Sequence, residues 1–447
     1  MTAVDSSPVD SSLWALQPDW LISMQPIGEV LTDHAVVVRD DAIADILPVP
    51  DLPQRYPGIR SMSLPDQVLL PGLINMHTHS AMTLLRGLAD DLPLMTWLHE
   101  HIWPAEQRWL GPEYVADGVR LACLEYLRGG ITCYNDSYFF PDVAAEVTRA
   151  VGMRAVMGAP VINFPTPWAQ HSDGYFARAM DLHQQCLDDV LIEMSFAPHA
   201  PYSVSDADFV RMRELSAEHD LRIHLHLLET SGEIADSVAQ YGLAPIQRLQ
   251  QLGLLNERLI AVHMTAIADA DMPLLAASGV HVVHCPESNL KLASGFCPLW
   301  QLQQAGVNVC VGTDGAASNN DLDLLGELRT ASLLAKGVSG DPQAAPAAQA
   351  LAMITINAAR ALNLDQRIGS IEVGKQADFC SIDLSDPDTQ PMHEIFSHLV
   401  YATCRQQVRH VWVAGQQLLH DREPLRLDLE QITQSTKKWQ QRIGAAQ

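Results

Sequence analysis

The sequence predicts an α/β fold, a TIM-type (β/α)8 barrel with a small composite β-sandwich domain built from both ends of the chain. From Leu69 to Asp314, short apolar runs alternate with longer amphipathic ones, which is the pattern of parallel strands joined by crossover helices. This span is close to the roughly 250 residues of an eightfold barrel, whereas an open doubly wound sheet usually needs fewer units. The remainder of the 447 residues is enough for a second, smaller module.

Eight apolar runs supply the predicted barrel strands, at residues 69–75, 130–134, 153–161, 191–197, 221–227, 259–264, 280–284 and 308–312. Two of the intervening helices have clear boundary signals. Gly111-Pro112 opens one helix with proline in the first turn, and Gly129-Gly130 closes it. Ser205 is a suitable cap for another, which runs to about His219. Strands and helices therefore alternate as a barrel requires.

Both ends of the chain contain short apolar runs between turns, outside the predicted barrel. They are DHAVVVRDDAIADILP near the start, and IGSIEVGKQADFCSIDL and VRHVWVAGQQLL near the end. We expect residues 1–68 and 368–427 to pair into one β-domain, beside a barrel of residues 69–367. Residues 428–447 are polar with helical spacing and predict a surface helix.

The composition excludes several classes of partner. The formal net charge of −25 repels phosphate backbones and anionic membranes, so it argues against nucleic-acid and membrane-surface binding. The eight cysteines are scattered without a C-x-x-C pair, which indicates reduced, buried thiols. The amino-terminal segment lacks the basic and apolar regions of a signal peptide, and no window is apolar enough for a membrane span. We therefore expect a cytoplasmic protein.

Four candidate metal ligands lie at the C-terminal ends of predicted strands. In PGLINMHTH, His77 and His79 are two positions apart and point to the same face of the first strand. Alternation in LRIHLHL puts His226 on the inward face near the end of its strand. In VNVCVGTD the same alternation directs Asp314 toward the barrel axis. All four side chains can therefore reach one point at the catalytic end of the barrel.

This ligand set has a definite metal preference. Neutral imidazoles with one carboxylate suit Zn²⁺, with Fe²⁺ or Mn²⁺ as alternatives, and such a site lowers the pKa of a bound water from ~16 toward ~7. An isolated H-x-H pair among 18 histidines is more often an ordinary packing or surface feature than a metal site. The convergence of four ligands from separate strands favours the metal site over that explanation.

Two further polar residues lie near the candidate ligands. Glu229 follows His226 by three positions and can reach over the metal as an acid or a base, although the alternative is a solvated loop glutamate. His263 ends the run LIAVH and can polarise a metal-bound water, although the alternative is a buried histidine hydrogen-bonded to the backbone. We favour the functional interpretation of both.

Several motifs together resemble the amidohydrolase superfamily, in particular its branch of purine-type deaminases and triazine hydrolases. The most specific motifs are PGLINMHTHSAMTLLRGLADDLPLMTWL, APHAPYSVS, HLHLLET, AVHMT, HCPESNLKLASG and GTDGAASNN, and the likeness covers nearly the whole chain. Within this branch the sequence looks most like the 5-methylthioadenosine/S-adenosylhomocysteine deaminases. The resemblance implies a barrel with a composite β-domain and one catalytic Zn²⁺, or sometimes Fe²⁺, per subunit.

The resemblance also assigns roles within the site. It implies metal ligation by His77, His79, His226 and Asp314. Glu229 is similar to the carboxylate that moves a proton to the purine ring nitrogen, and His263 to the histidine beside the nucleophilic water. No lysine occurs in the third and fourth strand runs, where binuclear relatives place a carbamylated bridging lysine, so a single metal is implied.

Substrate contacts follow from the same resemblance. Trp97 in MTWL is similar to the aromatic residue that lines the nucleoside pocket, Glu106 in WPAE to the carboxylate that binds ribose hydroxyls, and His199 in APHAPY to a further polar contact. The alternatives are a core tryptophan, a helix-surface glutamate and a loop histidine. A carboxylate suits a vicinal diol because it accepts two hydrogen bonds. Only Arg178 is available for the amino-acid tail of S-adenosylhomocysteine, and this scarcity favours 5′-methylthioadenosine or adenosine.

The implied reaction is hydrolytic deamination of adenosine-type nucleosides at C6, a reaction of purine salvage. A hydroxide on the metal attacks C6, protonated Glu229 donates to N1, and His263 and Asp314 take up the proton of the water before ammonia leaves. The alternatives are deamination of guanine or a related free base, and hydrolysis of a triazine amine or chloride, at the same site. A non-catalytic metal-barrel scaffold predicts the loss of an acid/base group, and none is lost here. The expected partner is a small nucleoside, and homo-oligomers are common among such enzymes.

Overall fold

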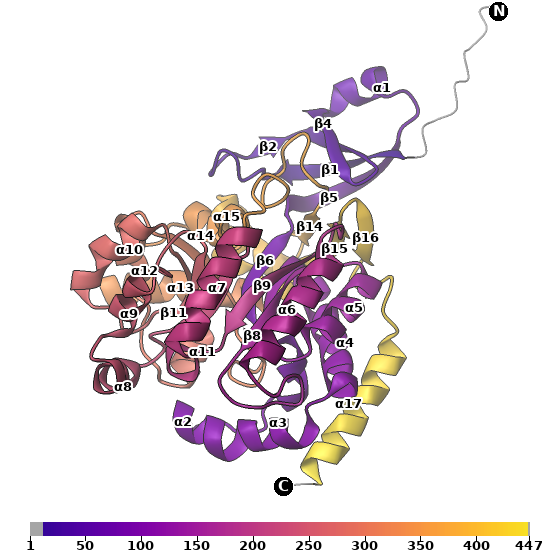
Figure 1. Ribbon diagram of the computed structural model, residues 1–447. Helices are drawn as coiled ribbons and strands as arrows, with labels where there is room; N and C mark the ends of the chain where they lie inside the picture. The colour runs from indigo at the N-terminus through magenta and orange to yellow at the C-terminus, as the bar shows by residue number, and fades with distance from the viewer. Residues whose placement is uncertain (1–11, 446–447) are drawn as a thin grey trace, which may run out of the picture.

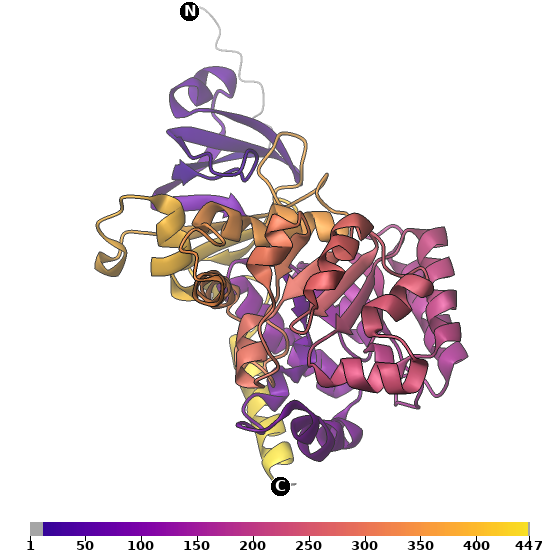
Figure 2. The ribbon, with the colours of Figure 1, turned by 90° about the vertical axis from the view of Figure 1, so that its left-hand side faces the viewer.

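The computed structural model describes residues 12–445. The start of the amino-terminal segment that lacks a predicted signal lies outside the described residues, as do the outermost residues of the predicted segments 1–68 and 428–447. Figures 1 and 2 show a barrel surrounded by helices and, above it, a β-domain in which the first strands, in indigo, lie beside strands from the C-terminal part of the chain.

Eight parallel strands form the barrel, in the order β13-β12-β11-β10-β9-β8-β7-β6. They are β6 (Leu73–Thr78), β7 (Ile131–Ser137), β8 (Arg154–Val161), β9 (Ile192–Pro198), β10 (Ile223–Leu227), β11 (Leu259–His263), β12 (His281–His284) and β13 (Asn308–Val311). The last strand, β13, lies against the first, β6. The eightfold α/β barrel predicted from the sequence is therefore confirmed.

Helices follow the strands and cover the outside of the barrel (Figure 1). They are α4 (Pro112–Arg128), α5 (Pro141–Val151), α6 (Ser172–Cys186), α7 (Asp206–His219), α8 (Gly232–Tyr241), α9 (Pro245–Gln251), α10 (Met272–Ser278), α11 (Pro286–Lys291), α12 (Leu299–Gln304), α13 (Leu324–Ser339), α14 (Ala347–Met353) and α15 (Ile356–Leu362). Ser205 caps α7 by accepting a hydrogen bond from the backbone N–H of Asp208 (3.1 Å). The predicted boundaries of α4 and α7 are thus both confirmed.

Alternate residues of the barrel strands enter two separate cores. Leu259 and Ala261 of β11 belong to the large core that includes the surrounding helices, whereas Ile260 and Val262 belong to a small core with Cys310. The twofold period of a strand produces this division, because successive side chains point to opposite faces of the sheet. The barrel interior is therefore packed with apolar side chains.

Strands from both ends of the chain form one mixed sheet, in the order β17-β16-β15-β14-β5-β1-β3-β4, with β2 paired to β1. These strands are β1 (Leu13–Leu21), β2 (Leu31–Thr32), β3 (His34–Arg39), β4 (Ala42–Pro48), β5 (Arg60–Pro71), β14 (Phe379–Asp383), β15 (Val408–Val413), β16 (Gln416–His420) and β17 (Glu423–Pro424). The two chain ends meet where β5 pairs antiparallel with β14. The composite β-sandwich predicted from the sequence takes the form of this single continuous sheet.

The apolar run 69–75, predicted as one barrel strand, is divided between the two sheets. Residues up to Pro71 belong to β5, and β6 begins at Leu73. Gly72 has no room for a side chain, because an added Cβ would lie 2.1 Å from the side chain of Thr132. The prediction of a single strand is wrong, since an unbroken apolar run gives no sign that the chain changes sheets within it.

The predicted C-terminal surface helix is α17 (Leu429–Gly444), which Asp428 caps by accepting hydrogen bonds from two backbone N–H groups. One face of α17 is buried, and the indole of Trp439 donates a hydrogen bond to Asp117 of α4 (2.9 Å). The helix therefore packs along α4 at the side of the barrel (Figure 1).

The cysteines carry no disulfide. All eight are free, and all except Cys404 are buried, as predicted for reduced thiols. Within residues 12–445, no helix combines the length and the hydrophobicity that crossing a membrane requires.

Candidate metal and active site

Four side chains meet at the C-terminal end of the barrel. His77 lies in β6 and His79 directly follows it, His226 lies in β10, and Asp314 follows β13. The Nε2 atoms of His77 and His79 lie 3.1 and 3.2 Å from Oδ1 of Asp314. Ligand atoms of His77, His79 and His226 lie within 4.8 Å of one another. The structure thus brings the four predicted metal ligands together.

The meeting of β13 with β6 depends on a glycine. A Cβ on Gly312 would lie 2.5 Å from the backbone nitrogen of His77, so only glycine allows the strands to approach this closely. Two residues later, the backbone N–H of Asp314 donates a hydrogen bond to the carbonyl of His77 (3.0 Å). Asp314 adopts a left-handed conformation with φ +59°, which is disfavoured for a residue with a side chain. The fold holds Asp314 in this conformation, beside the two histidines.

The donor set fits a divalent cation. The Nδ1–H of His79 donates to the carbonyl of Ser137, and the Nδ1–H of His226 donates to the carbonyl of His199 (2.6 Å). These bonds fix the ring tautomers and leave both Nε2 lone pairs free to bind a metal. Three imidazole nitrogens with one carboxylate oxygen suit Zn²⁺.

The protonation of the histidines supports the same fit. Burial lowers the pKa of His77 to about 4 and that of His226 well below its ordinary value, so both rings are neutral at pH 7, as metal ligands must be. Burial is the largest single effect on His79 and acts against its charged form, but the hydrogen bond and negative charge of Asp314, with the carbonyl of Ser137 and the charge of Asp136, together outweigh it and raise the pKa of His79 to about 9. A divalent cation between His79 and Asp314 would supply the positive charge that this pair otherwise takes from a proton.

The second oxygen of Asp314 is also held. Its Oδ2 accepts hydrogen bonds from the hydroxyls of Ser288 (2.6 Å) and Ser318 (2.8 Å). Burial opposes ionisation of this carboxyl, but the hydrogen bonds from His77 and His79 hold its pKa well below the usual range. Asp314 is therefore a carboxylate with one oxygen oriented by serines and the other directed at the histidines.

Glu229 and His263 lie next to this cluster. The Nε2 of His263 lies 3.8 Å from Oε2 of Glu229, and its Nδ1–H donates to Oδ1 of Asn289 (2.9 Å). This bond leaves Nε2 of His263 as the ring nitrogen that can accept a proton. Burial raises the pKa of Glu229, against the lowering effect of His263, so its protonated form is more populated than in water. One residue can donate a proton where the other can accept one.

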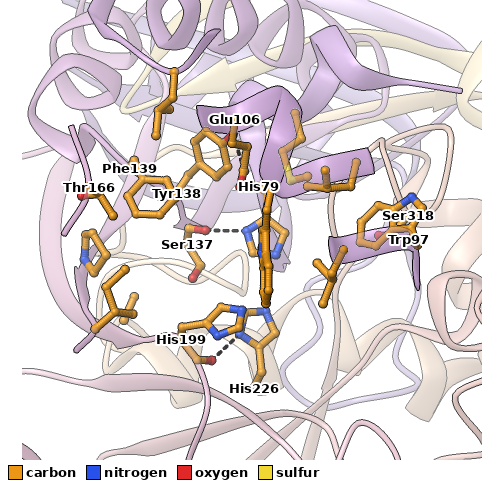
Figure 3. A pocket seen from close by; sticks show the side chains of 18 of the residues that line it. His79, Trp97, Glu106, Ser137, Tyr138, Phe139, Thr166, His199, His226 and Ser318 are labelled. Atoms are coloured by element: carbon orange, nitrogen blue, oxygen red, sulfur yellow. Dashed lines mark hydrogen bonds between the residues drawn. The ribbon is translucent and has the colours of Figure 1, made fainter. Parts of the chain in front are cut away.

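A cavity of about 550 Å³ opens onto the cluster, within the size range of small-molecule sites. Trp97, Glu106 and His199 line this cavity together with His79, His226, Glu229, His263 and Asp314. Figure 3 shows Trp97 and Ser318 on one side of it and Phe139 and Thr166 on the other. With Glu229, which was also predicted to contact the substrate, the structure therefore brings four of the five predicted substrate contacts to this cavity.

Glu106 lies in α3 (Trp103–Trp109), after the π-helix η3 (Trp97–Ile102) that contains Trp97. The hydroxyl of Tyr138 donates a hydrogen bond to Oε1 of Glu106 (2.7 Å). Burial raises the pKa of Glu106 to about 7, although the bond from Tyr138 acts in the opposite direction. Burial lowers the pKa of His199 to about 4. Glu106 is therefore a half-buried carboxyl in the cavity wall whose charge can change near neutral pH.

Arg178 is the predicted substrate contact that does not reach the cavity. It lies on the exposed face of α6, and its guanidinium lies 5.7 Å from the ring centroid of Trp168. None of the described residues that line the cavity is a lysine or an arginine. The cavity wall thus lacks the cation that was expected to bind a substrate carboxylate.

The sequence did not reveal several residues that hold these groups. Tyr138, Ser288, Ser318 and Asn289 contact Glu106, Asp314 and His263, as described above. Nε2 of His224 lies 2.9 Å from Nδ1 of His77. His224 is buried, and its own Nδ1 has no hydrogen-bond partner among residues 12–445. The motif HCPESN contains Ser288 and Asn289, and the run LRIHLHL directs His224 inward. Neither pattern shows which residues these side chains contact.

Sequence comparison agrees with this geometry. The profile of the amidohydrolase family matches residues 68–418. The 5-methylthioadenosine/S-adenosylhomocysteine deaminase of Saccharophagus degradans is 46% identical, over 95% of this chain and 96% of the relative. The enzyme of the same name from Teredinibacter turnerae is 45% identical, over 97% and 98% of the two chains.

Solved structures extend the comparison. An adenosine deaminase from Xanthomonas campestris with bound zinc is 53% identical and superposes with a TM-score of 0.95, over 97% of this chain and 98% of the other. The guanine deaminase of E. coli is 21% identical, with a TM-score of 0.82 over 92% and 100% of the two chains, so it supports the fold alone.

Proposed function

The chain belongs to the amidohydrolase family and is a metal-dependent hydrolase, and we propose that it deaminates adenosine-type nucleosides at C6. The substrates we consider are 5′-methylthioadenosine, S-adenosylhomocysteine and adenosine, each of which would yield ammonia and an inosine-type product. The observation that carries this proposal is one cavity lined by members of a metal-ligand cluster, by the acid/base pair Glu229 and His263 and by the half-buried carboxyl of Glu106. The names of the two curated relatives and the zinc in the Xanthomonas enzyme support it.

We propose that His77, His79, His226 and Asp314 hold one Zn²⁺ per subunit, with Fe²⁺ or Mn²⁺ as alternatives. A divalent ion in such a site supplies a nucleophile at neutral pH, because it lowers the pKa of water. The serines on Oδ2 of Asp314 keep its Oδ1 directed at the histidines. The chain's contribution is a fixed set of donors that needs no rearrangement during the reaction.

The proton transfers fall to Glu229, His263 and Asp314. Desolvation raises the pKa of Glu229, which favours its protonated form, and from this form Glu229 donates to N1 of the ring and makes C6 more electrophilic. His263 accepts the proton of the attacking water at Nε2, because Asn289 holds the proton on Nδ1. A C–O bond forms at C6, and the second proton of the water passes by way of Asp314, or of the deprotonated Glu229, to the amine. The C–N bond then breaks, ammonia leaves, and the proton on His263 restores the protonated form of Glu229.

Glu106, Trp97 and His199 are the proposed substrate contacts. A carboxylate accepts two hydrogen bonds, which matches the two hydroxyls of a ribose diol. The flat ring of Trp97 lines the cavity and can pack against the base or the sugar. Glu106 is the group that favours nucleosides over free bases, because a free base has no diol.

A panel assay tests the proposal. Metal content of the purified protein is measured together with ammonia release from the three nucleosides, from guanine and from a chlorotriazine. We expect one zinc ion per chain and ammonia release from the nucleosides with a kcat/KM far above that for guanine. Release from guanine alone, or chloride release from the triazine in place of nucleoside turnover, would contradict the proposed substrate class.

Four broader predictions accompany this function. We propose that the protein acts in purine salvage, in the cytoplasm and as a homo-oligomer, with no nucleic-acid or membrane partner. The negative net charge supports the last point, since it repels anionic surfaces. Light scattering of the purified protein measures the oligomeric state, and a monomer would contradict that part of the proposal.

A further inference from the structure

Glu233 lies outside the cavity but contacts the turn that carries Glu229. It belongs to the first turn of α8, and its carboxylate accepts hydrogen bonds from three successive backbone N–H groups. Oε1 accepts from Glu229 (2.7 Å) and Thr230 (3.2 Å), and Oε2 accepts from Leu228 (3.0 Å). One side chain therefore satisfies all three N–H groups of the turn.

The same turn is held from its other side by the segment after β11. The hydroxyl of Thr265 donates to the carbonyl of Glu229 (2.7 Å), and the backbone N–H of Thr265 donates to the carbonyl of Leu228 (2.9 Å). Glu233 thus holds the N–H groups of the turn, while Thr265 holds its carbonyl groups. The peptide units on both sides of the Glu229 Cα are fixed.

This turn needs such support. Leu228 has φ +51°, the left-handed region that residues with a side chain rarely adopt. Strained backbone of this kind persists only where the surroundings impose it, and it is common at functional sites. Without the carboxylate of Glu233, three N–H groups would lose their acceptor and the turn could relax away from this conformation.

We propose that Glu233 is a positioning residue that holds the carboxyl of Glu229 within reach of the substrate ring. The inference rests on the proton-donating role given to Glu229 in the proposed function. Glu229 is 14% exposed and lies 3.8 Å from His263, so a small shift of its backbone would change the distance to the group that it protonates. Misplacement of a reacting group by about 1 Å can reduce a rate about 100-fold.

The test uses the zinc-loaded enzyme and the variant Glu233→Gln, which keeps the size of the side chain but offers one acceptor oxygen in place of two. We expect kcat to fall about 10- to 100-fold while KM changes less than about twofold, with zinc content unchanged. The limb of the kcat–pH profile that reports the ionisation of Glu229 should disappear, because the carboxyl of Glu229 is no longer held in a fixed position beside the ring nitrogen. A role of Glu233 in stability alone would leave this profile unchanged in the folded variant.

A matched control comes from the opposite end of the barrel. The carboxylate of Asp189 also accepts two backbone N–H bonds, from Leu191 (2.8 Å) and Ile192 (3.1 Å), before β9 begins. Both bonds go to Oδ1, which an asparagine would keep, so Asp189→Ala is the variant that removes this kind of contact far from the cavity, together with the bond from Arg149, and we expect it to leave kcat unchanged. Thr265→Val is the second test variant. It keeps the shape of the side chain, removes the bond to Glu229, and should lower kcat in the same way.

Hydrogen exchange of the amides of 228–230 provides a measurement that does not depend on the substrate. In Glu233→Gln these amides should exchange at least about tenfold faster than in the wild type, while the amides of β10 keep their protection. Unchanged exchange, or an unchanged kcat in both Glu233→Gln and Thr265→Val, overturns the positioning role. A wild-type enzyme that releases no ammonia from any nucleoside overturns the proposed function instead.

Discussion

The two walls of the cavity are held in different ways. The strand wall, which consists of His79, His226 and Asp314 with the fully buried His77 beside them, is buried apart from part of His79. Each of these side chains has a defined hydrogen-bond partner. The helix wall, which consists of residues 94–110 and 162–167, is mostly apolar and reaches the surface, where Phe164 is 48% exposed.

This difference indicates that the two walls have different functions in the reaction and in the choice of substrate. Side chains on the strand wall are placed by the register of a closed barrel, which tolerates little movement. The helix wall is formed by a π-helix, a short α-helix and a loop, and these can change without disturbing the strands. We infer that the strand wall sets the reaction and the helix wall selects the substrate, as expected where an active site is built on barrel loops.

The largest effect should come from the strand wall. Asp314→Asn keeps the shape of the side chain but removes the charge that faces the histidines, so kcat on adenosine-type nucleosides should fall about 10³-fold or more with the fold retained. Steady-state kinetics measures the fall in kcat, and circular dichroism tests whether the fold is retained. Asp428→Asn, at the cap of α17, is the control and should remain fully active. Near-normal turnover by Asp314→Asn would refute the role given to the strand wall.

The next effect concerns a contact behind the strand wall. If His77 binds the metal through Nε2, its Nδ1–H donates to Nε2 of His224. His224→Phe removes this acceptor and should weaken zinc binding about 10- to 100-fold, as measured by competition with a chelator. The same change leaves the buried Nδ1–H of His77 without its acceptor, so the metal-free variant should be less stable than the metal-free wild type.

His284→Phe is the matched control for His224. His284 is also a buried histidine with an unpartnered Nδ1, and it lies in β12. Its replacement should leave the zinc affinity unchanged. Equal losses of affinity in the two variants would indicate a general effect of altering the barrel core, and would contradict a specific role for His224.

The strand wall could be predicted from the sequence because its residues follow simple rules. Side chains alternate between the two faces of a strand, so His77 and His79 lie on one face. Because the barrel strands are parallel, the C-terminal ends of all the strands lie at the same end of the barrel. The same rules do not reveal contacts that depend on exact backbone paths. The bond between His224 and His77 and the three bonds of Glu233 arise from a closed barrel and from a left-handed turn.

The substrate contacts of the helix wall and of the adjoining strand ends could be predicted only in part. Trp97, Glu106 and His199 came from resemblance to known motifs, and each lines the cavity. Tyr138 was missed, since it follows β7 in sequence and reaches Glu106 only because α3 packs over that strand end. Arg178 was assigned from its position after the third strand, but a helix turns residues away from the cavity as often as toward it.

A substitution in the helix wall should lower kcat/KM less than a substitution in the strand wall. Glu106→Gln removes one charged acceptor for the ribose diol, and should lower kcat/KM for nucleosides about tenfold at about pH 8 while affecting free bases little. Burial raises the pKa of Glu106 to about 7, so its charged form appears as the pH rises through that value. Wild-type kcat/KM should therefore rise from about pH 6 to about pH 8, and the variant should lose this rise.

Stability provides the control for Glu106→Gln. Because the pKa of Glu106 in the folded protein lies above its ordinary value of 4.5, ionisation of this group reduces the stability of the fold as the pH rises toward and through about 7. The Glu106→Gln variant should thus be at least as stable as the wild type at about pH 8.

Glu100→Gln, an exposed change in the same segment, should have no effect on the pH profile of kcat/KM. A profile that is identical in wild type and Glu106→Gln would assign the rise to another group.

The smallest effect is expected at Arg178, and it tests where the helix wall ends. Its guanidinium lies on the exposed face of α6 against Trp168, and no described cavity-lining residue is cationic. Arg178→Ala should therefore change kcat/KM for both 5′-methylthioadenosine and S-adenosylhomocysteine by less than about twofold. Kinetics with the two substrates measure this directly. A selective loss with S-adenosylhomocysteine would mean that the loop after β8 folds over the substrate and brings Arg178 to its carboxylate, which would extend the helix wall beyond residue 167.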